Sequence, residues 1–146
     1  MKKPTALLAL ITLLISPFVY AQTTPRAMAK PGEEVHVWAY PVKAGKQKQY
    51  EHFVHDIFWP GAKKLSAGEQ RVFKQTRVMH PTKANADGTF TYLFIMDPYI
   101  KGGDYDIESL IKKMYGPKQG AEHYKLFNGA VVPGKDVGYQ AIQSKD

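Results

Sequence analysis

The sequence predicts a single α+β domain with the element order β-α-β-β-α-α-β. Three observations predict this class. Within several short segments, two kinds of side chain alternate from one residue to the next, which is the period of a β-strand. Two other segments carry apolar residues at positions i, i+3, i+4, i+7 and i+8, which is the pattern of an amphipathic helix. Turn-forming Gly, Pro and Asp residues separate these segments, and 146 residues suffice for one domain.

The first predicted strand covers residues 35–40, and Pro41 and Gly45 bracket its end. Two sets of side chains alternate along it. One set is small and aliphatic: Val35, Val37 and Ala39. The other set is aromatic: His36, Trp38 and Tyr40. We expect the small set to pack beneath the helices and the aromatic set to occupy the opposite face of the sheet.

The next two elements are a helix and a more polar strand. The helical pattern covers residues 50–58, and Pro60-Gly61 is expected to end or kink it. Residues 71–80 read RVFKQTRVMH and are predicted to form the second strand. Its polar composition favours a place at the edge of the sheet. On it, Arg71, Gln75 and Arg77 are expected to share one face.

The remaining elements follow the Asp87-Gly88 turn. Residues 89–96, TFTYLFIM, are apolar on both faces and predict a central strand. Asp106 is the expected N-cap of a helix over residues 107–115. Gly116 is expected to end that helix, with a second helix running from Pro117 to about residue 127, before Asn128-Gly129. Residues 137–143 predict the last strand.

This order is the split β-α-β arrangement of ferredoxin-like domains, in which the first and third strands are central and helices cover one face. The other face would expose apolar surface at a cost of about 25 cal/mol per Å². Through strands such as VHVWAYPV and TFTYLFIM, residues 33–143 resemble the dimeric α/β-barrel superfamily. The resemblance implies a homodimer whose two sheets close face to face around a cavity. Members of the superfamily include small monooxygenases, isomerases and haem-handling proteins.

The leading functional prediction is the binding of a small apolar or aromatic ligand in that cavity between the sheets. His36, Trp38, Tyr40 and Tyr92 are the predicted lining, with Arg77 as an anchor for an anion. One alternative is a cofactor-independent monooxygenase or isomerase of the same fold, in which His36 is the candidate catalytic base. A second alternative is a protein-interaction module of the cell envelope, which would use the positive charge and a His52/Trp59 stripe.

No cofactor is predicted. Two histidines at i and i+3, His52 and His55, are the candidate metal ligands, but a polar helix face on which His52 pairs with Asp56 is the favoured interpretation. The superfamily resemblance allows a haem, although no haem-ligand motif is recognised. The chain has no Cys, which excludes disulfides, thiolate metal sites and a cysteine nucleophile.

The first 21 residues predict a secretory signal peptide. Lys2 and Lys3 precede an apolar run, and cleavage is expected after Ala21, which directs the protein to the periplasm or outside the cell. A flexible leader over residues 22–32 and one domain over residues 33–146 would follow, with no transmembrane segment. The net charge of +7 becomes +5 without the two lysines. The scattered remaining lysines indicate a solvated surface, so we expect no nucleic-acid partner.

Overall fold

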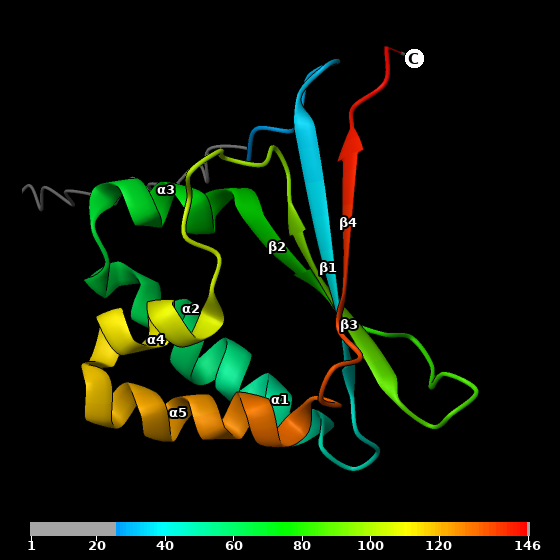
Figure 1. The fold of residues 1–146 in the computed structure, drawn as a ribbon, viewed down its shortest axis with the longest axis vertical. Coiled ribbons are helices and arrows are strands. Elements are labelled where there is room, and N and C mark those ends of the chain that lie inside the picture. Colours follow the sequence, from blue (N-terminus) through cyan, green and yellow to red (C-terminus); the bar gives the residue numbers. More distant parts are fainter. Residues whose placement is uncertain (1–25, 146) are drawn as a thin grey trace, which may run out of the picture.

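The computed structural model describes residues 26–145, so the predicted signal peptide lies outside the described residues. The α+β class is confirmed: a four-stranded antiparallel sheet carries helices on one side (Figure 1). The strands are β1 Glu34–Val42, β2 Thr76–Met79, β3 Phe90–Met96 and β4 Val137–Ile142. Their order is β2-β3-β1-β4, with β1 and β3 central and mutually paired. The sheet is open and does not close into a barrel within this chain.

The first helical region is longer than predicted. It runs through α1 (Gln47–Glu51), the π-helix η1 (His52–Phe58), α2 (Trp59–Gly61) and the 3₁₀ turn η2 (Ala62–Lys64). The α-helical part ends at Gly61, as predicted, and the 3₁₀ turn extends the helical region by three residues; Pro60 falls in the first turn of α2, where a proline is tolerated. Gly61 continues the helix past Met114, whose sulfur would lie 2.8 Å from a Cβ at this position.

The predicted second strand is wrong in its first half. Residues 71–75 belong to helix α3 (Ala67–Gln75), and β2 starts only at Thr76. A capping box begins the helix: the Glu69 amide donates to the Ser66 hydroxyl, and the Ser66 amide donates to the Glu69 carboxylate at 3.1 Å. The expected common strand face of Arg71, Gln75 and Arg77 therefore does not exist.

Helices α4 (Ile107–Tyr115) and α5 (Pro117–Ala130) form an adjacent pair. The predicted cap of α4 is confirmed, since the Asp106 carboxylate accepts the Ser109 amide at 2.6 Å. α5 passes through Asn128-Gly129, so the predicted stop there is wrong. Gly120 allows the two helices to approach closely, because a Cβ there would lie 2.6 Å from the Lys112 Cα. None of the described helices is long and apolar enough to cross a membrane.

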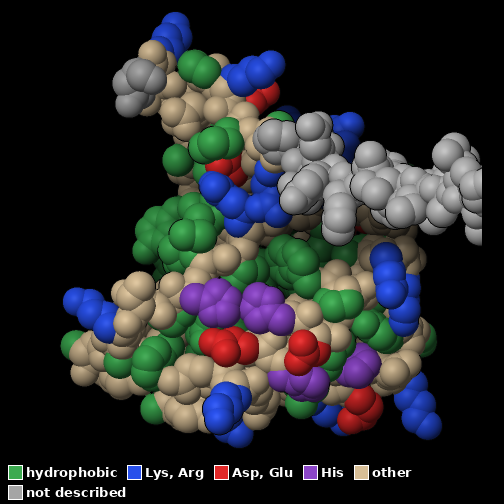
Figure 2. Space-filling model, turned by 180° about the vertical axis from the view of Figure 1, so that it is seen from behind, with side chains coloured by type: hydrophobic (Ala, Val, Ile, Leu, Met, Phe, Trp, Pro, Cys, Tyr) green, Lys and Arg blue, Asp and Glu red, His purple; other side chains and the backbone are tan. Residues whose placement is uncertain are grey.

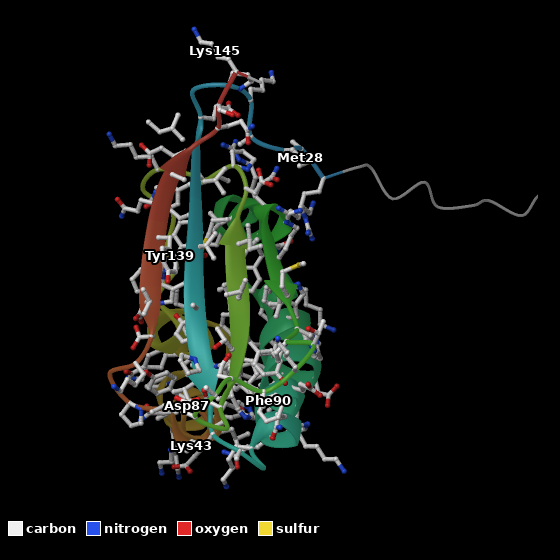
Figure 3. All side chains as sticks on the ribbon, turned by 90° about the vertical axis from the view of Figure 1, so that its right-hand side faces the viewer. Met28, Lys43, Asp87, Phe90, Tyr139 and Lys145 are labelled. Carbon is white, nitrogen blue, oxygen red and sulfur yellow. The ribbon has the colours of Figure 1, made fainter. Side chains whose placement is uncertain are left out.

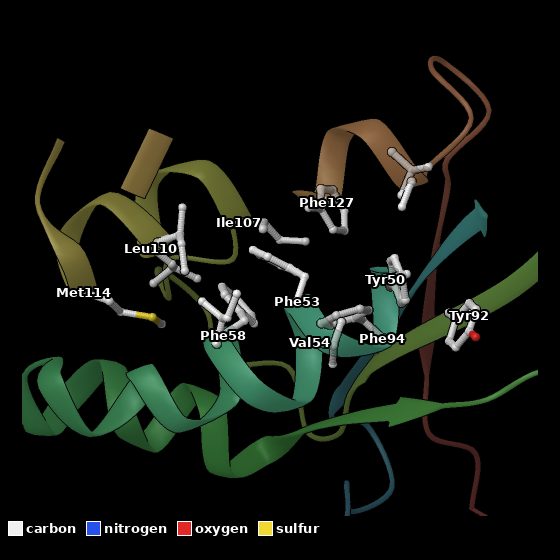
Figure 4. Close-up of a cluster of buried hydrophobic side chains, with 14 of the residues drawn as sticks. Tyr50, Phe53, Val54, Phe58, Tyr92, Phe94, Ile107, Leu110, Met114 and Phe127 are labelled. Carbon is white, nitrogen blue, oxygen red and sulfur yellow. The ribbon is translucent and has the colours of Figure 1, made fainter. Parts of the chain in front are cut away.

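The strand register reverses the predicted faces of the sheet. His36, Trp38, Tyr40 and Val42 of β1 stand opposite Met96, Phe94, Tyr92 and Phe90 of β3. Val42 is fully buried and Tyr92 is 1% exposed, so this aromatic set faces the helices and the core (Figure 4). The aliphatic set of β1 lies on the uncovered face, which Figure 3 views directly. Aromatic rings are large enough to fill the space between sheet and helices, whereas the small side chains are not.

Candidate functional site

A groove of about 530 Å³ lies between the sheet and the helix pair α4–α5. We call it the sheet–helix groove. Its volume is in the range of small-molecule sites, roughly 300–1,000 Å³. Three aromatic side chains come from β1: His36, Trp38 and Tyr40. The other aromatic lining comes from the segment after β3 and from α5: Tyr99, Tyr105, Tyr124 and Phe127. Residues 131–134 and Asp136, from the segment that leads into β4, complete the lining.

Stacked rings form one wall of the sheet–helix groove. The His36 ring lies on the Tyr99 ring with centroids 3.7 Å apart and planes 14° apart. Tyr99 in turn stacks on Tyr105 at 5.0 Å and 22°. The Tyr105 hydroxyl accepts the Ile100 amide at 2.9 Å, which holds the outermost ring in place. This wall is therefore ordered before any ligand arrives.

Trp38 owes its position in the groove to a glycine on the neighbouring strand. Gly138 of β4 is the register partner of Trp38 in β1. A Cβ on Gly138 would lie 1.8 Å from the indole ring, so the ring occupies the space that a side chain at position 138 would fill. The indole remains 38% exposed, although a ring of this size is normally covered. An exposed, fixed aromatic face of this kind is suited to stacking on a flat molecule.

Two carboxylates make the lining of the groove acidic. Asp106 and Asp136 line it, and no Lys or Arg does so among the described residues. Burial, and after it Asp136 and the neighbouring Tyr124 and Asp106, raises the pKa of Tyr40 above its ordinary value of 10.0. Burial also raises the pKa of Tyr124. Both hydroxyls therefore stay protonated at neutral pH and can donate a hydrogen bond.

His36 is the histidine among the described residues that line the groove. Its Nε2 lies 3.0 Å from the Glu34 carboxylate, and its ring face is covered by Tyr99. The side chain is 15% exposed. These contacts fix the direction of the imidazole. A role of His36 as a catalytic base stays a prediction.

Two residues predicted to line the ligand cavity lie outside the groove. Tyr92 is in the core, where its hydroxyl donates to Glu51 at 2.6 Å. Arg77 follows the helical residues of α3 and points to the uncovered face of the sheet, opposite Ile95. Its guanidinium pairs with the buried Asp97 carboxylate at 2.6 Å. Arg77 is therefore held by a carboxylate of the domain itself, away from the groove.

The candidate metal ligands His52 and His55 make different contacts. His52 Nδ1 lies 2.8 Å from the Asp56 carboxylate, which confirms the predicted pairing. His55 Nε2 lies 2.9 Å from the Nε2 of His80, a contact across 25 residues of sequence. Trp59 packs against the core beside Phe73, with ring centroids 5.5 Å apart. It does not extend an exposed stripe with His52.

Sequence reasoning missed the residues that complete the groove beyond β1. Tyr99 and Tyr105 flank the Gly102-Gly103 pair, in the segment between β3 and α4. The sequence signal that could have identified them is the presence of two large aromatic residues in a short polar loop, because fully exposed rings are uncommon. No sequence pattern indicates that Asp136 lies near Tyr40, because this proximity depends on how β4 pairs with β1.

Comparisons with known proteins give no match: no family model, no curated protein and no solved structure is significantly similar to this chain. The function must therefore be argued from the groove itself.

Proposed function

We propose that the protein binds a small, flat organic molecule, neutral or positively charged, in the sheet–helix groove. The observation that carries this proposal is the combination of the stacked wall of His36, Tyr99 and Tyr105 with the exposed indole of Trp38. Preformed aromatic faces with a few polar groups are typical of small-molecule sites.

The charge of the lining narrows the class of ligand. Asp106 and Asp136 would repel an anion, and the described lining contains no Lys or Arg to offset them. A ligand cation would gain from both carboxylates and from the negative faces of the Trp38 and Tyr40 rings, an attraction worth about 0.5–2 kcal/mol. The chain as a whole has a net charge of +7, so this acidic lining is a local feature.

Three probes with the same indole ring test the proposal. Tryptamine carries a cation, 3-ethylindole is neutral and indole-3-propionate carries an anion on a chain of similar length. Titration calorimetry of the purified protein should give the tightest binding for tryptamine, weaker binding for 3-ethylindole and the weakest for indole-3-propionate. Trp38→Ala should weaken tryptamine binding by at least tenfold, because it removes the exposed ring face.

A variant on the other face of the sheet supplies the matched control. Tyr139 is 58% exposed on β4, and Tyr139→Ala removes a similar ring without touching the groove. It should leave tryptamine binding unchanged. Absence of binding by tryptamine and 3-ethylindole at millimolar concentration would overturn the proposal. Tightest binding by indole-3-propionate would overturn its charge preference while leaving the groove as the site.

We further propose that the domain is ferredoxin-like and that a second copy covers its uncovered sheet face. The strand order and the placement of the helices of residues 26–145 on one face of the sheet support the first part. Exposed side chains on or beside that face support the second: Met79, Val137 and Tyr139 are 45–58% exposed. Their apolar surface would be covered by pairing two such faces. In this arrangement the ligand lies between sheet and helices of each copy and not between the two sheets.

A further inference from the structure

Two histidines outside the groove are hydrogen-bonded to each other on the surface. His55 lies on the π-helix η1, and His80 directly follows β2. Their Nε2 atoms share a hydrogen bond of 2.9 Å, and the ring planes differ by 15°. The ring centroids are 5.0 Å apart, so the two nitrogens approach each other more closely than the ring centres do. Both side chains are exposed, and Figure 2 shows imidazole groups gathered beside carboxylates on this surface.

A chain of contacts from the core directs the His80 ring. Tyr92 of β3 donates its hydroxyl to Glu51 at 2.6 Å. The same Glu51 oxygen lies 3.5 Å from His80 Nδ1. A carboxylate near Nδ1 favours the proton on that nitrogen, so His80 Nε2 is the acceptor of the hydrogen bond with His55 Nε2 until an ion replaces the donor proton. Histidines that bind metals are commonly oriented by a carboxylate in this way.

The spacing of the two nitrogens suits a shared ion. Two imidazole nitrogens that each lie about 2.0–2.1 Å from one ion, at adjacent coordination positions, are roughly 2.9–3.4 Å apart. The observed 2.9 Å falls at the short end of this range. The described residues hold no group of three or more potential ligands, so water or an added ligand would complete the coordination.

We propose that His55 and His80 bind one divalent transition-metal ion of the class that prefers imidazole, with Cu(II) bound most tightly. Imidazole nitrogen suits Cu(II), Zn(II) and Ni(II), and Cu(II) is the strongest binder in that series. Glu51 positions His80 through Nδ1 and does not contact the ion. η1 contributes by placing His55 toward β2, and π-helical turns often occur at functional sites.

Cu(II) alone is the probe that tests this site. Titration of the purified, untagged protein, followed by electron paramagnetic resonance, should show one bound Cu(II) with nitrogen hyperfine splitting. His55→Gln and His80→Gln should each weaken that binding at least tenfold, because each leaves a single imidazole. Glu51→Gln should weaken Cu(II) binding less than either histidine variant does. The double variant Glu51→Gln/His80→Gln should bind Cu(II) as weakly as His80→Gln alone, because Glu51 acts only through His80.

His52→Gln is the matched control, since His52 lies on the same π-helix and contacts Asp56 instead. It should leave the Cu(II) affinity unchanged. Circular dichroism should show that all variants keep the fold, because every substituted histidine is exposed. The proposal is overturned if saturable binding is absent below 1 mM, if His55→Gln and His80→Gln bind like the unaltered protein, or if His52→Gln causes an equal loss.

Discussion

Replacing Gly138 by Ala should displace Trp38 and disable the sheet–helix groove. The new methyl carbon would lie 1.8, 2.3 and 2.7 Å from three atoms of the indole ring. Ordinary contact begins at 3.4 Å, so the nearest ring atom has to move by at least about 1.6 Å. Gly138 is in a strand paired to the strand of Trp38, so the exposed ring moves more easily than the backbone.

The displacement has separate consequences for stability and for binding. Crowding of this kind costs about 1–3 kcal/mol in a core, and we expect about 1 kcal/mol here because β4 is an exposed edge strand. Tryptamine affinity should fall at least tenfold, since the ring face on which the ligand stacks has moved. The indole N–H resonance of Trp38 should shift, whereas that of Trp59 should not.

Gly68→Ala supplies the control for this prediction. Gly68 is in α3, and a Cβ there meets no atom within 4 Å. This variant should retain the Trp38 resonance and the tryptamine affinity of the unaltered protein. The reasoning fails if Gly138→Ala leaves both the Trp38 resonance and tryptamine binding unchanged.

Three further predictions test contacts that stabilise the domain. Gly120→Ala should lower the free energy of unfolding in guanidinium chloride by about 1–2 kcal/mol, because the new methyl group meets the α4 backbone. If this variant is as stable as Gly68→Ala, the close approach of α4 and α5 is contradicted. Asp97→Ala should lower the free energy of unfolding in urea by about 1.5–3 kcal/mol, because the buried carboxylate accepts hydrogen bonds from the Arg77 guanidinium and from the Ala29 amide. A loss below about 0.5 kcal/mol would contradict this prediction. Hydrogen bonding from Lys113, and then from Ser66, the N-cap of α3, lowers the pKa of Glu69 from 4.5 to about 2. The ionised Glu69 carboxylate therefore stabilises the folded state above pH 4.5, and this stabilisation disappears as the pH falls toward 2. Thermal unfolding of Glu69→Gln should accordingly depend less on pH in that window, and an unchanged dependence would exclude the contact.

Elements with strong end signals were predictable from the sequence. The bounds of α4 follow from the Asp106 cap and from Gly116, whose φ of 80° favours glycine. The central position of β1 and β3 follows from their apolar composition. By contrast, α3 was missed because residues 71–80 are rich in strand-forming side chains, although Ser66 and Glu69 already had the spacing of a capping box.

The faces of the sheet and the long-range contacts were not predictable in the same way. Alternation shows which side chains share a face, but it does not show which face the helices cover. The prediction assigned the small residues to the helices, and the structure places His36, Trp38 and Tyr40 there. The His55–His80 contact joins residues 25 positions apart and depends on the π-helix and on β2 together.

The most direct test of the proposed ligand groove is a two-dimensional ¹H–¹⁵N NMR titration of the protein with tryptamine. We expect saturable shifts for the amides of β1 around Trp38, for the Tyr99–Tyr105 segment and for the end of α5 near Tyr124. Amides around Met79 on the uncovered side of the sheet should not move. Shifts confined to that uncovered face, or no saturable shifts at millimolar tryptamine, would contradict the central claim that the sheet–helix groove is the ligand site.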